Sequence, residues 1–287
     1  MSVNPSLERA LEQLRLRSMR EHYERLAADA AGANLSYERY LQMLVEQELY
    51  QRELTRQNRC VAQAHFPVLK ELADFDWEAI PSLNKARILA LTQGSYLEQA
   101  ETVLLIGNPG LGKTHIATSL GLAACRQGQR VRFYTAAGLI SELIQAQSEH
   151  RLARALTALH KYRLLIVDEL GFLPLSQTGA HLLFQFCSSL HEQVSLIVTS
   201  NLRFAEWTQL FGSESLTAAL LDRLTARAHI VEFVGESYRL RQRRQRDQQA
   251  GDDFGGAAPK PPTNRKGRGQ LFDDQVVNNS VITTTNV

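Results

Sequence analysis

The stretch Gly107-Asn108-Pro109-Gly110-Leu111-Gly112-Lys113-Thr114 decides the fold of this chain of 287 residues. It matches the pattern GxxxxGK[ST], in which glycines let the backbone curl so that successive N–H groups point at phosphate oxygens. An apolar run at 103–106 precedes it, and a helical pattern that would turn its positive end toward the same anion follows. The stretch therefore predicts a phosphate-binding loop between a strand and a helix. The alternative is a glycine-rich turn that holds no ligand.

Short apolar runs recur along the chain around this loop. They lie at residues 103–106, 131–134, 164–167, 196–199 and 229–234. Helical patterns separate most of them, which predicts a parallel sheet with crossover helices. The fold class is therefore α/β, with the P-loop nucleoside triphosphatase core as its expected form.

Two acidic residues end the apolar run at 164–167. Asp168 is placed to hold a Mg²⁺ ion together with the Thr114 hydroxyl, while Lys113 would reach the β- and γ-phosphates of ATP. ATP and Mg²⁺ are thus the expected cofactors. The alternative is a solvated acidic pair at the end of a strand.

Two further residues are candidates for the chemistry of hydrolysis. Glu169 is the natural general base for the attacking water, and P-loop kinases need no such glutamate. Asn201 follows the strand at 196–199 and could sense the γ-phosphate. The alternative for Asn201 is a residue that merely begins the next loop.

Composition limits the class of protein. The apolar fraction is 44%, and the net charge of +2 means that any basic surface must be local. Cys60, Cys125 and Cys187 show no CxxC spacing, which favours reduced thiols over disulfides or a zinc site. No signal peptide and no run long enough to cross a bilayer is recognisable, so we expect a cytoplasmic protein that does not contact membranes.

The chain divides into three regions. Residues 1–80 show helical patterns, with Asn4 and Pro5 as one helix start and Ser36 near another, and they predict a small all-α domain. Residues 81–246 would form the ATPase domain. Residues 247–287 cannot bury enough apolar surface to form a core and are expected to be disordered.

Arginines at helical spacing are candidates for DNA contact. Arg52, Arg56 and Arg59 would align into a basic stripe, although Glu48 and Glu53 could pair with it as a solvated face. Arg151 and Arg154 are further candidates for DNA contact.

The order of these motifs resembles the IstB-like AAA+ ATPases, helper proteins of insertion-sequence transposition that are related to the DnaC-type helicase loaders. The resemblance rests on GNPGLGKTH, LLIVDELGFLPLS, IVTSN, the DRL segment around Arg223 and the terminal GESYR, and it covers residues 1–246. It implies an AAA+ module whose C-terminal lid is reduced or absent.

The resemblance also implies residue roles. Arg223 would be an arginine finger that completes the site of a neighbouring subunit; the alternatives are a surface arginine paired with Asp222, or Arg227 as the finger. Arg239 would sense the nucleotide, although a DNA contact or a plain surface charge is also open. An isolated histidine such as His115 is more often a core or surface residue than a ligand. The implied nucleotide-binding residues are Gly107, Asn108, Pro109, Gly110, Leu111, Gly112, Lys113, Thr114, His115 and Arg239.

The function that the resemblance implies is ATP-dependent assembly of a homo-oligomer, as a ring, spiral or filament, on duplex DNA, where it recruits or stimulates a transposase. A DnaC-like helicase loader shares every motif and differs in its partner. Residues 1–80 hold no Cys/His cluster of the kind that such loaders often carry, which favours transposition. A small-molecule kinase and a nucleotide switch with little hydrolysis are the remaining alternatives.

Overall fold

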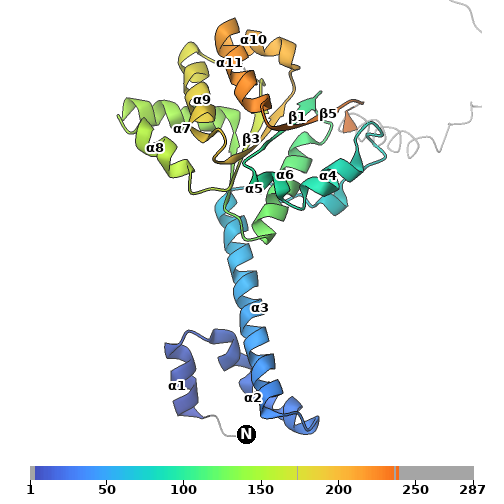
Figure 1. The fold of residues 1–287 in the computed structure, drawn as a ribbon, viewed down its shortest axis with the longest axis vertical. Helices are drawn as coiled ribbons and strands as arrows, with labels where there is room; N and C mark the ends of the chain where they lie inside the picture. The colour runs from blue at the N-terminus through green and yellow to red at the C-terminus, as the bar shows by residue number, and fades with distance from the viewer. Residues whose placement is uncertain (1–3, 173, 236, 239–287) are drawn as a thin grey trace, which may run out of the picture. The chain divides into compact units, whose positions relative to one another are not determined.

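Five parallel strands form one sheet in the order β2-β3-β4-β1-β5 (Figure 1). This computed structural model describes residues 4–172, 174–235 and 237–238. Each strand contains a predicted apolar run, except that β5 ends one residue before its run does, so the parallel α/β fold is confirmed. The strands are β1 (Thr102–Gly107), β2 (Val131–Thr135), β3 (Leu164–Leu170), β4 (Ser195–Ser200) and β5 (Ala228–Phe233).

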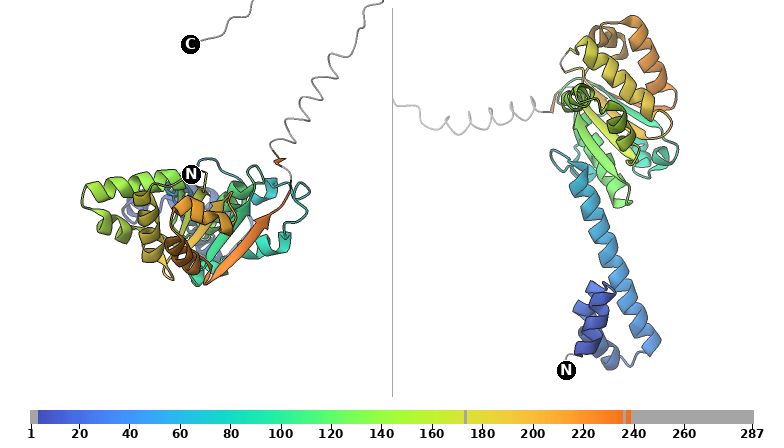
Figure 2. Two further views of the ribbon diagram at one scale, coloured as in Figure 1. Left: turned by 90° about the horizontal axis from the view of Figure 1, so that it is seen from above. Right: turned by 90° about the vertical axis from the view of Figure 1, so that its left-hand side faces the viewer.

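Helices cover both faces of this sheet, which gives three layers (Figure 2). The α-helices are α1 (Pro5–Gln13), α2 (Arg17–Gly32), α3 (Tyr37–Ala64), α4 (Lys85–Leu91), α5 (Ser95–Glu98), α6 (Lys113–Arg126), α7 (Ala136–Ser148), α8 (Leu152–Leu159), α9 (Gln177–Leu190), α10 (Trp207–Phe211) and α11 (Glu214–Thr225). One core cluster joins α6, α4, α5 and the end of α3 to one face of the sheet. A second joins α7, α8, α9, α10 and α11 to the other face.

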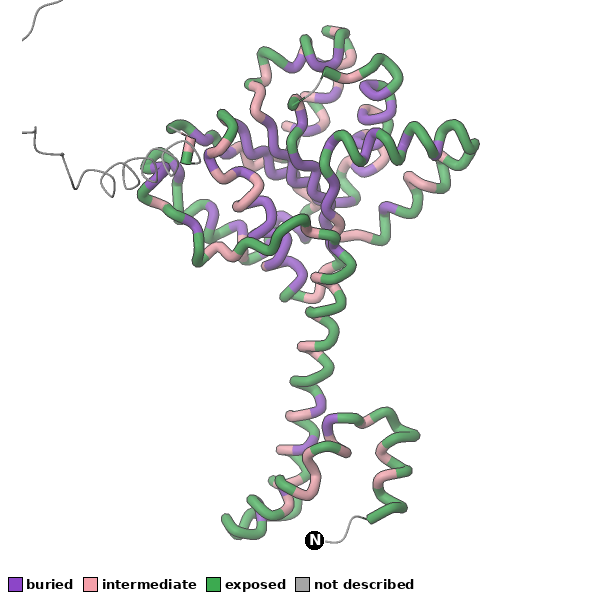
Figure 3. Tube along the Cα trace, turned by 180° about the vertical axis from the view of Figure 1, so that it is seen from behind, coloured by how far each residue is buried: buried purple, intermediate pink, exposed green. Residues whose placement is uncertain are grey.

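Strand side chains alternate between these two clusters. In β1, Val103 and Leu105 belong to the α6 side, while Leu104 and Ile106 belong to the α9 side. Because both faces are covered, consecutive residues are buried in the central strands β1, β3 and β4, and these strands read as continuous apolar runs (Figure 3). This is why the strands could be recognised from the sequence.

The N-terminal helices begin at the expected caps. The Asn4 side chain accepts hydrogen bonds from the N–H groups of Ser6 and Leu7, and Ser36 caps α3 in the same way. The helical pattern expected over residues 1–80 ends earlier, however, at Ala64. His65 takes a left-handed conformation with φ 58°, and Pro67 then disfavours helix in the residue before it.

The segment after α3 packs onto the sheet instead of continuing the helix. Its one helical piece is the short 3-10 helix η1 (Leu72–Asp74). Phe75, Ala79 and Ile80 belong to the core cluster on the α6 side, together with Leu105 of β1. This places an irregular, apolar segment beside the phosphate loop.

The C-terminal predictions concern residues outside those described. Any lid after β5 and the tail at 247–287 both lie beyond Tyr238, the last residue that the structure describes. Across the described ranges, no helix is both long and apolar enough to cross a membrane.

Candidate functional site

The phosphate loop leaves β1 at Gly107 and enters α6 at Lys113. Gly110 and Gly112 both have φ 81°, a left-handed conformation that other residues adopt only with strain. A Cβ atom at Gly112 would also come within 2.7 Å of the Phe75 ring. The glycines therefore allow the curl that turns the loop and the positive end of α6 toward an anion.

Lys113 is held within this loop. Its side chain is buried, and Nζ donates hydrogen bonds to the carbonyl oxygens of Gly107 at 2.6 Å and Asn108 at 2.8 Å. These bonds place the positive charge where the loop can present it to phosphate oxygens. Lys113 thus lies in the phosphate loop, and its contact with the β- and γ-phosphates stays a prediction.

Asp168 is the centre of a buried hydrogen-bond network. Thr114 Oγ1 lies 3.0 Å from both of its carboxylate oxygens, and Thr199 Oγ1 lies 2.6 Å from Oδ1. A carboxylate beside a hydroxyl suits a hard divalent cation, which prefers oxygen ligands. Within the described residues, no group of three or more His, Cys, Asp or Glu side chains could hold a metal by itself. A cation at Thr114 and Asp168 would therefore need oxygen atoms from a ligand or water.

A bulge sets the direction of Glu169. The pairing of β3 with β4 shifts register between Val167 and Leu170, and Glu169 has φ 62°. Its N–H donates a 2.9 Å hydrogen bond to Thr199 Oγ1, while its side chain is exposed and lines the cleft beside the phosphate loop. A bulge of this kind re-aims a side chain at the edge of a sheet. Glu169 thus faces the cleft next to buried Asp168.

Asn201 lies at the same end of the sheet. It follows β4 and lines the cleft with Lys113, Thr114 and Glu169. Its Oδ1 is buried and has no hydrogen-bond partner among the described residues. A buried polar atom of this kind is expected to meet a ligand or water.

The segment at 65–80 supplies a wall of the cleft that the motifs did not reveal. The described residues of this segment that line the cleft are Pro67, Val68, Lys70, Asp74, Phe75, Asp76, Ala79 and Ile80. GxxxxGK[ST] specifies contacts to phosphates and says nothing of the rest of a nucleotide. The one signal in the sequence is an aromatic, proline-containing stretch between two helices.

This segment is tied to α6. His115 Nε2 lies 2.7 Å from the carbonyl oxygen of Glu71, and Ser119 Oγ donates to the carbonyl of Lys70 at 2.9 Å. Arg126 forms an ion pair with the Glu71 carboxylate. Because a carbonyl oxygen only accepts, Nε2 of His115 carries a proton. His115 lines the cleft and at the same time anchors its wall.

The GESYR segment also reaches the phosphate loop. The N–H of Tyr238 donates a 3.0 Å hydrogen bond to the carbonyl of Gly110, and a Cβ atom at Gly110 would approach Ser237 Oγ to 2.2 Å. The next residue, Arg239, lies outside the described residues.

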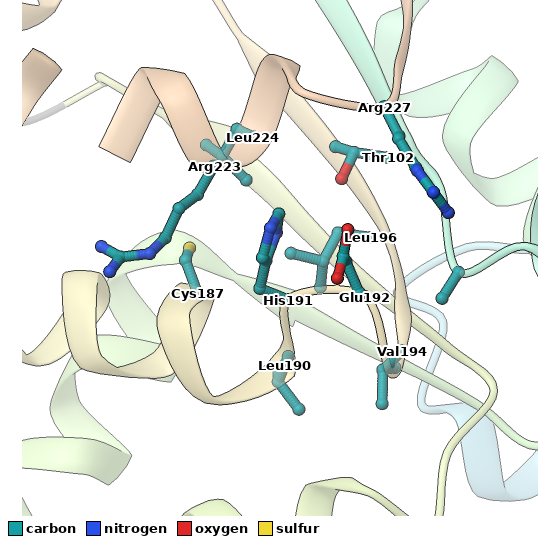
Figure 4. Close-up of a pocket in the computed structure, with 11 residues that line it drawn as sticks. Thr102, Cys187, Leu190, His191, Glu192, Val194, Leu196, Arg223, Leu224 and Arg227 are labelled. Carbon is teal, nitrogen blue, oxygen red and sulfur yellow. The ribbon is translucent and has the colours of Figure 1, made fainter. Parts of the chain in front are cut away.

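Arg223 lies far from the phosphate loop of its own chain. It lines a small pocket with Thr102, the first residue of β1, whereas the loop follows the last residue, Gly107 (Figure 4). The six residues of β1 span roughly 16 Å at about 3.3 Å per residue. The sites predicted to cooperate are therefore at opposite ends of the sheet.

The Arg223 guanidinium lies over an aromatic ring. Its guanidinium carbon lies 4.5 Å from the centre of the Phe184 ring, and no ion pair with Asp222 occurs within the described ranges. Burial raises the pKa of the neighbouring Cys187 thiol to about 12, so this thiol is neutral at physiological pH. The guanidinium of Arg227 points to the other side of the pocket (Figure 4).

Three of the five DNA-contact candidates are ion-paired. Arg52 pairs with Glu48 at 2.8 Å, Arg56 pairs with Glu53 at 2.9 Å, and Arg151 pairs with Glu149. The pairing considered for the stripe is thus present, but the Glu48 carboxylate is buried, so only the Arg56–Glu53 pair is solvated. The other two candidates, Arg59 and Arg154, are exposed.

Comparisons with known proteins agree with this site. The family model described as IstB-like ATP binding protein matches residues 9–246. The ATP-binding protein of insertion sequence IS21 from Pseudomonas aeruginosa is 37% identical over 238 residues, or 83% of this chain and 90% of that protein. That of insertion sequence IS5376 from Geobacillus stearothermophilus is 35% identical over 240 residues, or 84% and 96%.

Among solved structures, the DnaC helicase loader is similar at 19% identity with a TM-score of 0.44, over 52% of this chain and 87% of that one. The family match and the two relatives span most of the chain, and the homologues are ATP-binding proteins, consistent with ATPase activity. The chain belongs to the family of IstB-like ATP-binding proteins.

Proposed function

We propose that this ATPase assembles on duplex DNA as an ATP-dependent homo-oligomer and there recruits or stimulates a transposase. The observation that carries the proposal is the position of Arg223, at the opposite end of β1 from the phosphate loop of its own chain. An arginine finger placed in this way serves a second copy of the chain. The relatives from insertion sequences support a role in transposition.

Lys113, Thr114 and Asp168 act at the phosphate end of the nucleotide in this proposal. Lys113 contacts the β- and γ-phosphates, and Thr114 and Asp168 hold Mg²⁺. The bound Mg²⁺ offsets the negative charge of the phosphate oxygens. The apolar wall at Phe75 and Ile80 receives the base, because a flat, weakly polar ring loses little by leaving water there.

Glu169 and Asn201 act on the attacking water. The exposed Glu169 carboxylate accepts its proton, and the Asn201 side chain orients it against the γ-phosphate. Arg223 from a neighbouring subunit stabilises the charge that develops on the phosphoryl group. The contact of Tyr238 with Gly110 supports Arg239 as a second cation near the phosphates.

DNA binding follows assembly because one subunit offers few basic contacts. A net charge of +2 is too small for tight binding by a lone chain, whereas linked subunits multiply weak contacts. Contacts to the backbone give little dependence on base sequence.

Electron microscopy and fluorescence anisotropy on the same duplex test this proposal. With an ATP analogue we expect a ring, spiral or filament on the DNA, and with ADP or no nucleotide we expect weak binding. Equally tight binding without nucleotide would exclude the assembly step. Stimulation of strand transfer by a transposase supports the transposition role, while loading of a replicative helicase would assign the chain to the loaders.

A further inference from the structure

A second cleft lies at the other end of the sheet from the nucleotide site. It is bordered by the end of α3, the start of β2 and the turn before β3. The cations that line it are Arg130, Arg132 and Lys161, with His65 beside them, and we call this cleft the β2 groove. No Asp or Glu occurs among the described residues that line it.

The arginines and the lysine of the β2 groove differ in their partners from Arg52 and Arg56 of the α3 stripe. Within the described ranges, none of Arg130, Arg132 and Lys161 forms an ion pair, whereas Arg52 and Arg56 do. The Arg132 guanidinium lies over the Tyr134 ring and the Lys161 ammonium over the Tyr162 ring. An aromatic face attracts a cation without neutralising its charge.

Arg132 carries the strongest sign of a missing partner. Its Nε atom is buried and has no hydrogen-bond partner among the described residues. A buried donor left without an acceptor destabilises the folded chain, and more strongly when the group is charged. Like charges gathered in one cleft add repulsion, which an anion would relieve.

Phosphate is the anion that suits these donors. A guanidinium presents its N–H groups in a planar fork that matches two phosphate oxygens, and an ammonium serves as a point charge beside it. The cations come from separate segments, and Arg130, Lys161 and His65 are exposed at the rim. Such a spread favours successive phosphates of a polymer over one enclosed ion.

The groove continues toward the basic stripe of α3. The Arg56 guanidinium lies against Gly128, two residues before Arg130. A Cβ atom placed on Gly128 would come within 2.2 Å of this guanidinium. The α3 stripe and the β2 groove therefore meet at this turn.

We propose that the β2 groove binds backbone phosphates of duplex DNA. This inference rests on the proposed DNA-binding function. It places the main DNA contact of the chain in the β2 groove and not at the ion-paired arginines. Binding is independent of base sequence, because backbone phosphates carry no sequence information. Each phosphate contact contributes about 0.9 to the slope of log affinity against log salt.

The test compares two double variants of the full chain by anisotropy on labelled duplex with an ATP analogue, over a series of salt concentrations. Arg130→Gln/Lys161→Gln removes two groove cations. Arg17→Gln/Arg20→Gln removes two cations of α2 that pair with Glu21 and Glu12. We expect the groove variant to lose about 1.8 from the salt slope and about 10- to 100-fold in affinity. The control should bind like the parent.

Both variants should keep the parental ATP affinity and the ATPase rate without DNA, which shows that the fold is intact. Arg132→Gln alone should lower the slope by about 0.9. A groove variant with parental affinity and slope would overturn the groove and leave the proposed function standing. A parent chain that binds no duplex in any nucleotide state would overturn both.

A competition arm separates DNA from a small anion. Inorganic phosphate should displace the duplex from the parent no better than chloride at equal ionic strength. Displacement by millimolar phosphate that is lost in the groove variant would make the groove a small-anion site and overturn the assignment to DNA.

Discussion

The Thr199 hydroxyl donates a 2.6 Å hydrogen bond to Oδ1 of Asp168 and accepts a 2.9 Å hydrogen bond from the N–H of Glu169. One buried atom on β4 thus contacts both acidic residues at the end of β3. Glu169 needs this support, because a left-handed conformation costs a residue other than glycine about 1–2 kcal/mol. Thr199 is therefore a positioning residue for both carboxylates.

Thr199→Val keeps the shape of the side chain and removes both hydrogen bonds. We expect kcat to fall by about 10- to 100-fold with little change in ATP affinity, because Glu169 loses the bond that fixes its bulge. Steady-state kinetics and calorimetry measure the two effects. Thr199→Ser retains the hydroxyl and should restore most of the rate. An unchanged kcat in a correctly folded valine variant would rule out the positioning role.

Lys113→Ala should abolish ATP binding. The variant loses both the charge that faces the phosphates and the two hydrogen bonds to the loop carbonyls. We expect affinity to fall at least about 100-fold, since charge-assisted contacts to phosphate are strong. Isothermal calorimetry gives the affinity, and Lys161→Ala is a control that removes a lysine outside the nucleotide cleft. Equal ATP affinity in Lys113→Ala and the parent would refute the loop assignment.

Glu169→Gln should bind ATP and hydrolyse it about 10²- to 10⁴-fold more slowly, because the amide orients water but accepts no proton. Assemblies on DNA should persist in this variant. The exposed Glu142 provides a matched control as Glu142→Gln. Phosphate-release assays compare the three proteins, and parental turnover in Glu169→Gln would show that another group is the base.

The parts of the fold that could be predicted are those in which local sequence and tertiary packing agree. Strands covered on both faces show as apolar runs. Gly128 follows the end of α6 with φ 74° and its N–H bonded to the carbonyl of Cys125, as is common for a glycine that ends a helix. The phosphate loop is local in sequence for the same reason. Asp168 and Thr114 could be assigned to one site from the sequence, because a motif fixes Asp168 near the end of a strand and Thr114 at the start of a helix.

The remainder depends on contacts between distant segments. Thr199 on β4 acts through Asp168 and Glu169 on β3. The cleft wall at Phe75 forms where an irregular segment meets α6. No periodicity marks either of them. The β2 groove likewise gathers single cations from separate segments, whereas the α3 stripe was visible because its spacing is helical.

Glu48→Gln should destabilise the N-terminal helices without affecting ATP binding. The buried Glu48 carboxylate on α3 accepts from the N–H groups of Ser18 and Met19 at the start of α2, and from Arg52. Loss of this charged cap costs about 1–2 kcal/mol. Hydrogen exchange at Ser18 and Met19 measures the loss. Glu46→Gln, which alters an exposed glutamate of the same helix, should show parental exchange.

Arg223→Ala should leave ATP binding intact and lower hydrolysis by about 10³-fold, because the finger acts on the phosphoryl group of a neighbouring subunit. The roughly 16 Å length of β1 separates Arg223 from its own loop. Only an intact Arg223 from another subunit should therefore restore the lost ATPase activity. Mixing Arg223→Ala with Lys113→Ala tests this, since some interfaces then pair an intact loop with an intact finger. ATPase activity should rise above that of either variant alone and peak at intermediate ratios. Arg227→Ala, from the opposite side of the same pocket, should hydrolyse ATP at the parental rate. If no mixing ratio restores activity, Arg223 does not act across subunits.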